Sequence, residues 1–191
     1  MSEGRLTLKS IAGYCVEEAL WKLAIDIASD LQEEKRELAG IAPDMVIIDN
    51  DEFHLVVKDA AMPEFCAPEG IASKAATVWS IGALLCYASS GHLIFGGSGS
   101  LYQRKHPAVK LPALQKKHSS LTSLVQRCLI YSPENRISLN DLVIEAQVGL
   151  ELCKKRGRCK SNVKDEKMQP PKSSIDERWP EEMIDNTILK L

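Results

Sequence analysis

Aromatic residues are scarce in this sequence: Phe, Tyr and Trp together make up 5% of its 191 residues. Because 45% of the residues are nevertheless hydrophobic, we expect a core built mainly of Leu, Ile, Val and Ala. Excess positive charge is also missing, since the formal net charge is −2. Proteins that bind nucleic acid usually present a basic face, so the composition argues against nucleic acid as a partner.

Metal-site and disulfide motifs are missing as well. No two cysteines form a C-x-x-C pair, and the four histidines are scattered, so the spacing of a zinc site does not occur. We therefore expect no metal, no cofactor and reduced thiols. The cysteines are Cys15, Cys66, Cys86, Cys128, Cys153 and Cys159.

Long apolar runs are the third absence. The first ten residues, MSEGRLTLKS, contain no hydrophobic stretch of signal-peptide length. No segment approaches the roughly 18 continuous apolar residues that read as a membrane helix. The sequence therefore predicts a cytoplasmic protein that does not bind a membrane.

Helical periodicity dominates what is present. Apolar residues recur at helical spacing over residues 16–32, with acidic residues on the opposite side, which predicts an amphipathic helix. The mainly apolar segment 75–89 predicts a buried helix, and segment 119–132 predicts another. A Ser-x-x-Asp capping box at Ser138 predicts a last helix that ends at Leu150.

One hairpin interrupts the helices, and the composition changes near the end. Segment 45–57, MVIIDNDEFHLVV, predicts two short strands around an Asn-Asp turn. After Cys153 the chain is basic, polar and proline-containing, so we place one domain at 1–153 and a tail at 154–191. Apolar residues within 175–191 suffice for a short docking helix. The expected fold is mainly α with one small β-hairpin.

Several motifs follow one another as they do in the large C-terminal lobe of a protein kinase. Ala-Pro-Glu at 67–69, Trp-Ser-Ile-Gly at 79–82 and LVQRCLIYSPENRISLNDLV at 124–143 resemble motifs of that lobe. The resemblance covers residues 6 to about 152. It implies a kinase-like C-lobe with no N-lobe, and a buried ion pair between Glu69 and Arg136.

The residues that carry the chemistry of this family are replaced. LAGIAPDM at 38–45 takes the place of the catalytic loop, with Gly40, Ala42 and Met45 at the positions of its Asp, Lys and metal-binding Asn. Val57 stands at the position of the metal-binding Asp of Asp-Phe-Gly. Phosphoryl transfer needs a base, metal ligands and a lysine, and a thioether is a poor ligand for Mg²⁺. The resemblance therefore implies a protein that is not an enzyme.

Scaffold motifs that persist beside degenerate chemistry resemble the kinase non-catalytic C-lobe domain, a pseudokinase fragment whose members are protein-interaction modules. A bacterial kinase lobe that decayed independently would give the same pattern. Two further functions stay open. One is a residual nucleotide-binding or phosphotransferase protein that uses Asp44, Asp49 or Asp59 with an N-lobe from another chain. The other is a pseudokinase subunit that regulates a true kinase.

Acidic residues concentrate between Glu17 and Glu64, which favours a protein or basic peptide as partner. Part of the non-catalytic family binds a basic peptide through an acidic groove. An ordinary solvated helix face is the alternative interpretation, and the sequence makes no prediction of the oligomeric state. The candidate acidic binding surface comprises Glu17, Glu18, Asp26, Asp30, Glu33 and Glu34.

Overall fold

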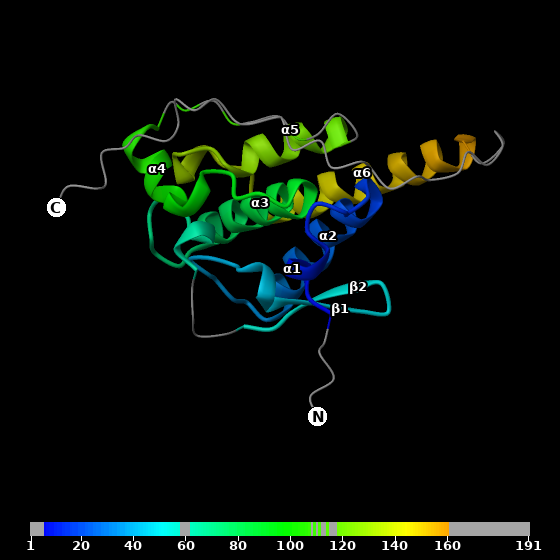
Figure 1. Cartoon of the computed structure of the whole chain (residues 1–191), viewed down its shortest axis with the longest axis horizontal. Helices are drawn as coiled ribbons and strands as arrows, with labels where there is room; N and C mark the ends of the chain where they lie inside the picture. The colour runs from blue at the N-terminus through cyan, green and yellow to red at the C-terminus, as the bar shows by residue number, and fades with distance from the viewer. Residues whose placement is uncertain are drawn as a thin grey trace.

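The computed structural model of this chain describes residues 6–57, 62–107, 109, 111, 114 and 118–160. This part of the chain is mainly helical and contains one two-stranded antiparallel sheet, which confirms the expected secondary-structure class. Figure 1 shows α2, α3, α5 and α6 gathered into one body, with the hairpin on one side of it. The elements are α1 (Leu8–Ile11), α2 (Glu17–Glu33), β1 (Val46–Asp49), β2 (Glu52–Leu55), α3 (Lys74–Ser90), α4 (Ser100–Lys105), α5 (Ser119–Cys128) and α6 (Leu139–Lys160).

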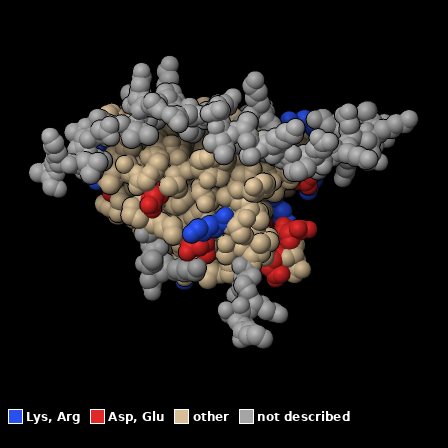
Figure 2. All heavy atoms as spheres, in the orientation of Figure 1, with Lys and Arg blue, Asp and Glu red and all other residues tan. Residues whose placement is uncertain are grey.

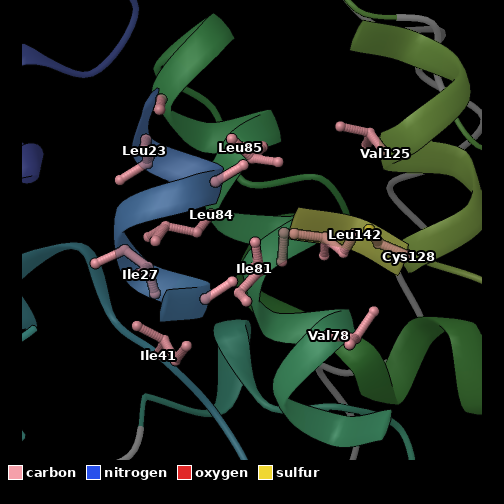
Figure 3. Close-up of a cluster of buried hydrophobic side chains, with 14 of the residues drawn as sticks. Leu23, Ile27, Ile41, Val78, Ile81, Leu84, Leu85, Val125, Cys128 and Leu142 are labelled. Atoms are coloured by element: carbon pink, nitrogen blue, oxygen red, sulfur yellow. The ribbon is translucent and has the colours of Figure 1, made fainter. Parts of the chain in front are cut away.

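The core forms where α2, α3 and α6 meet. Leu23 and Ile27 of α2 lie beside Ile81 and Leu84 of α3, and Leu142 of α6 joins the same cluster (Figure 3). Each of these side chains is at most 1% exposed. A fully buried Leu or Ile contributes roughly 1.5–3 kcal/mol, so this contact region stabilises the arrangement of the three helices.

Helix α3 is the central element, because it is buried on nearly every side. It begins after Ser73, whose Oγ accepts a hydrogen bond from the amide of Ala76 at 3.0 Å. It ends at Gly91, whose φ of 75° is a left-handed conformation that favours glycine. Despite the apolar character of α3, no helix in the described ranges combines the length and the hydropathy needed to cross a membrane.

Helices α2 and α6 pack side by side in opposite directions. At one end, Gln32 Nε2 donates a hydrogen bond to Asn140 Oδ1 at 2.8 Å. At the other end, Arg156 Nη2 donates to Glu17 Oε1 at 3.1 Å. These two contacts join the end of α2 to the start of α6 and the start of α2 to the last turns of α6.

The predicted hairpin is present, with β1 paired to β2 in an antiparallel register that sets Val46 opposite Leu55. Asn50 and Asp51 form its turn with φ of 48° and 63°. Asn and Asp tolerate this left-handed region better than other residues with side chains, and such turns match the twist of the strands. The amide of Ile48 donates to the carbonyl of Leu6 at 2.9 Å, so the N-terminal segment covers the free edge of β1.

The last helix is longer than the capping box and the change in composition indicated. It extends to Lys160 instead of ending at Leu150. Most residues added are good helix formers, and Arg156 is held by its ion pair with Glu17. The proposed docking helix within 161–191 lies outside the described residues, so the predicted tail stays a prediction.

Candidate functional site

The segment that resembles a catalytic loop lies directly against the Cys-Ala-Pro-Glu segment. Gly40 forms an isolated antiparallel bridge with Cys66, and the amide of Ala67 donates to the carbonyl of Ala39 at 2.9 Å. Ser80 of α3 contacts both segments, and its Oγ donates a hydrogen bond to the Phe65 carbonyl at 3.0 Å. Backbone hydrogen bonds therefore hold the loop against the Cys-Ala-Pro-Glu segment, and the Ser80 hydroxyl connects both segments to α3.

Gly40 has no room for a larger residue. A Cβ atom built at this position would lie 2.7 Å from Cys66 Sγ and 3.1 Å from the carbonyl oxygen of Phe65. These distances are shorter than ordinary carbon contacts, which favour about 3.5–4.0 Å. The position that the resemblance assigns to the catalytic base is consequently a close backbone contact.

The other three positions with degenerate chemistry are apolar and pack into the protein. Ala42 is 1% exposed and Met45 is 2% exposed. The amide of Ala42 donates to Met45 Sδ at 3.3 Å, so the thioether is turned back onto its own loop. Val57 is half-buried against the core cluster. These four positions thus supply no charge, no base and no hard oxygen ligand.

The acids considered for a residual catalytic role are dispersed. Asp44 is half-buried within the loop at 38–45, Asp49 is exposed at the end of β1, and Asp59 lies outside the described residues. Within the described ranges, no group of three His, Cys, Asp or Glu side chains is arranged to hold a metal ion. The described acids therefore offer no assembled site for a phosphate-bound metal.

Asp26 and Asp30 have a structural partner in β2. Asp26 Oδ2 accepts a hydrogen bond from the amide of Phe53, and Asp30 Oδ2 accepts one from the amide of Leu55, each at 3.1 Å. Residues four apart on a helix rise about 6 Å, and residues two apart on a strand span almost the same distance. The two carboxylates therefore match successive free amides along the edge of β2.

These carboxylates also belong to a row of negative charge. Burial raises the pKa of Asp26, hydrogen bonding by Phe53 and the charge of Lys22 oppose this effect, and the charges of Glu52 and Asp30 add to it. Glu33 lies a further turn along the face of α2 that bears Asp26 and Asp30, and it is exposed. We call Asp26, Asp30, Glu33 and Glu52 the acidic row.

The remaining predicted acids divide between this region and another. Glu34 contacts Arg36 at 3.2 Å near the end of α2. Glu18 is exposed near the start of α2, whereas Glu17 is turned toward α5 and α6. The carboxylate of Glu17 accepts from Arg156, from the hydroxyl of Ser120 and from the indole of Trp21 at 3.4 Å. The six predicted acids thus do not form one continuous surface.

The hairpin turn adds acids to the same side as the acidic row. Asp49 and Asp51 are exposed beside Glu52 of the row, and Figure 2 shows red spheres gathered over the end of the hairpin. Lys22 Nζ donates to the backbone carbonyl of Asp51 at 2.5 Å, which fixes the turn against α2. The hairpin was predicted as a structural element, but its alignment with Asp26 and Asp30 depends on a tertiary contact.

Two cysteines lie deep in the α3–α5 contact. Burial raises the pKa of the Cys86 thiol to about 12, and it raises the pKa of Cys128 still further. Both side chains are at most 5% exposed. They therefore behave as small protonated hydrophobes and not as nucleophiles at neutral pH.

An apolar stripe on α6 was not anticipated as a functional feature. Ile144, Val148 and Leu152 are each more than half exposed, although they occur in a helix whose opposite face is buried. Their spacing of four residues was visible in the sequence. Which side of α6 faces the core depends on how α2 and α5 pack against it.

The sequence matches no protein-family model, and a search of curated proteins gives no significant match. The geometry of the described residues is therefore the basis for the functional proposal below.

Proposed function

We propose that this chain is a non-catalytic, kinase-like C-lobe that acts as a protein-interaction module or pseudokinase regulator. The main support is the contrast between two sets of positions. Glu69 and Arg136, which the resemblance assigns to a scaffold ion pair, contact each other through two hydrogen bonds of 2.6 and 2.9 Å. The positions assigned to chemistry are occupied by a buried glycine and by apolar side chains.

The absence of phosphoryl transfer follows from this occupancy. Catalysis of that reaction consists almost entirely of positioning and electrostatic stabilisation by a base, metal ligands and cationic groups. Ala42, Met45 and Val57 provide none of these groups, and the packing around Gly40 opposes addition of a carboxylate. An N-lobe supplied by another chain would not replace residues in this loop.

The partner that this surface favours is a protein with a basic segment. Asp26 and Asp30 already accept hydrogen bonds from β2, yet each carboxylate keeps a second oxygen, and Glu33 and Glu52 are exposed. A row of negative charge attracts basic partners and accelerates their encounter. The buried, unpaired thiols of Cys86 and Cys128 fit a cytoplasmic setting for this interaction.

A binding measurement with a short fluorescent peptide rich in Lys and Arg tests the proposed partner class. The full chain should bind the peptide, with an affinity that decreases as salt rises because exposed charges are screened. The double variant Glu33→Gln with Glu52→Gln should bind more weakly. A matched control, Glu134→Gln with Glu151→Gln, removes the same charge from other exposed positions and should retain binding.

Two results would contradict the proposal. Equal binding by the two double variants would place the basic partner elsewhere or show only non-specific attraction. Mg²⁺-dependent transfer of labelled phosphate by the full chain would contradict a non-catalytic role. A ligand that binds only the folded state raises its stability. Because we expect the chain not to bind ATP, ATP with Mg²⁺ should leave the melting temperature unchanged.

A further inference from the structure

The outer face of α6 exposes a continuous apolar stripe. Ile144, Val148 and Leu152 are 59%, 56% and 54% exposed, and their four-residue spacing brings them to the same side of successive turns. The opposite side of α6 carries Leu142 and Ala146, which are fully buried. Figure 1 shows the last turns of α6 extending to one side of the other helices.

Helices α5 and α2 contact α6 along one edge of this stripe. Arg127 of α5 contacts Glu145, and Glu17 of α2 contacts Arg156. Arg156 lies one turn beyond Leu152, and Glu145 lies on the same edge of α6 as Arg156, so both contacts border the row on one side and at its end. Ile144, Val148 and Leu152 themselves stay exposed. Large exposed aliphatic side chains in a row are a common mark of a protein interface.

The stripe is complementary to itself when reversed. In an antiparallel pair centred on Val148, Ile144 lies opposite the partner's Leu152, and Val148 lies opposite the partner's Val148. The same centre sets Asp141 opposite the partner's Lys155, because these residues are equally far from position 148. Both are exposed, and a seven-residue displacement is about two helical turns, so they lie near the line of the stripe.

We propose that the outer face of α6 binds a second copy of this chain in an antiparallel, two-fold arrangement. Such an interface uses the same patch on both copies, so the apolar contacts and the Asp141–Lys155 charge pair each occur twice. Three apolar side chains per copy make a small contact compared with the roughly 800 Å² per partner of standard interfaces. The dimer is therefore reversible and dissociates on dilution. This association uses a different face from the acidic row and is independent of the proposed function.

Sedimentation velocity of the full chain over a range of concentrations tests the dimer. The wild-type sedimentation coefficient should rise from the monomer value toward the dimer value as concentration increases. Val148→Glu should remain monomeric throughout, because it sets two carboxylates against each other at the two-fold axis. The matched control Gln126→Glu introduces the same charge at an exposed position of α5 and should retain the wild-type rise. A wild-type chain that is monomeric throughout, or unchanged association of Val148→Glu, would overturn the proposal.

A charge exchange tests the antiparallel register. Asp141→Lys alone sets two lysines against each other in each charge pair, and Lys155→Asp alone sets two acids together, so each variant should dimerise less than wild type. An equimolar mixture of the two should form heterodimers. In a heterodimer each lysine at position 141 or 155 of one variant lies opposite an acid of the other, so both charge pairs are restored. Asp141 also contacts Ser138 at the start of α6, so Asp141→Lys changes the cap of that helix, but a lost cap cannot produce recovery on mixing. A mixture that associates no better than its components would overturn this register. Dimerisation that occurs only after truncation following Lys160 would instead indicate that residues 161–191 occupy the stripe in the full chain.

Discussion

Arg136 contacts Glu69 through both terminal nitrogens, with Nη1 at 2.6 Å from Oε1 and Nη2 at 2.9 Å from Oε2. Its remaining donors reach the backbone carbonyls of Ile130, Tyr131 and Ala75. All five N–H donors of this guanidinium are thereby used, and its side chain is fully buried. One side chain thus joins the segment before α3, the first turn of α3 and the loop after α5.

Removal of this guanidinium should destabilise the fold strongly. Arg136→Ala leaves the Glu69 carboxylate without its partner and three backbone carbonyls without their donor. Breaking a buried pair from one side typically costs roughly 3–5 kcal/mol. Denaturant unfolding should show this loss for Arg136→Ala and almost none for Arg104→Ala, which removes an exposed arginine at the end of α4.

Double-mutant analysis separates the pair from the other contacts of Arg136. The combination Glu69→Ala with Arg136→Ala should cost less than the sum of the single changes, because the orphaned charge is no longer present. The double variant should still be less stable than wild type, since the carbonyls of Ile130, Tyr131 and Ala75 remain without their donor. Strictly additive losses would show that the ion pair itself contributes little.

Residue patterns were sufficient to predict the long helices and the hairpin but not the contacts between them. The periodicity over residues 16–32 and the apolar run at 75–89 predicted α2 and α3 because each follows from local spacing. The hydrogen bonds from β2 to Asp26 and Asp30 could not be predicted in this way. They require α2 and β2 to pack at a particular offset along their axes, which only tertiary packing determines.

The same distinction applies to the candidate surface. Glu17 and Asp26 belong to one helix and have the same charge, yet Glu17 faces α5 and α6 whereas Asp26 faces the hairpin. An acidic helix was readable from composition, but the division of its acids between two neighbourhoods was not. Neither short α1 nor α4 was predicted, because a helix of one or two turns leaves little periodicity to detect.

The contact at Gly40 predicts that even the smallest side chain is harmful there. Gly40→Ala places a methyl group 2.7 Å from Cys66 Sγ and 3.1 Å from backbone atoms, so the two segments must separate. Overpacking of this kind costs about 1–3 kcal/mol. Gly97→Ala provides the control, because a Cβ there would meet nothing within 4 Å.

Two further variants examine what this contact means for function. Gly40→Ala with Cys66→Ala should recover part of the lost stability, because the sulfur is gone while the backbone contacts remain. Gly40→Asp, which supplies the acid of an active catalytic loop, should unfold more readily and transfer no phosphate. Phosphate transfer by Gly40→Asp would show that only one residue separates this loop from activity.

Asp26 predicts a pH dependence of stability with a definite sign. Its pKa is raised in the folded state, chiefly by burial, so the folded chain binds this proton more strongly than the unfolded chain does. The free energy of unfolding therefore decreases as pH rises from the unfolded pKa near 3.8 through the folded pKa, and the cost persists above it. Asp26→Asn keeps an oxygen for the amide of Phe53 and removes the titration.

Denaturant midpoints measured from acidic to neutral pH test this prediction. Asp26→Asn should match wild type at low pH, where the acid is protonated in both states, and should become relatively more stable as pH rises. Asp26→Ala should be less stable than Asp26→Asn at every pH, because the amide of Phe53 loses its acceptor. A wild-type advantage over Asp26→Asn that grows toward neutral pH would reverse the assigned sign.

The packing of α2 on α6 depends on the absence of a side chain at Gly149. A Cβ there would lie 2.6 Å from the ring of Trp21, which is buried between the helices. Alanine ordinarily stabilises a helix interior by about 0.5–1 kcal/mol relative to glycine. At Gly149 we expect the opposite sign, with a loss of about 1–3 kcal/mol, because the indole or one of the helices must shift.

Thermal or denaturant unfolding of Gly149→Ala measures the effect, and the Trp21→Leu background identifies its cause. With the smaller leucine opposite, Gly149→Ala should become neutral or stabilising, as helix propensity alone predicts. A similar loss in both backgrounds would mean that the clash is not with the indole.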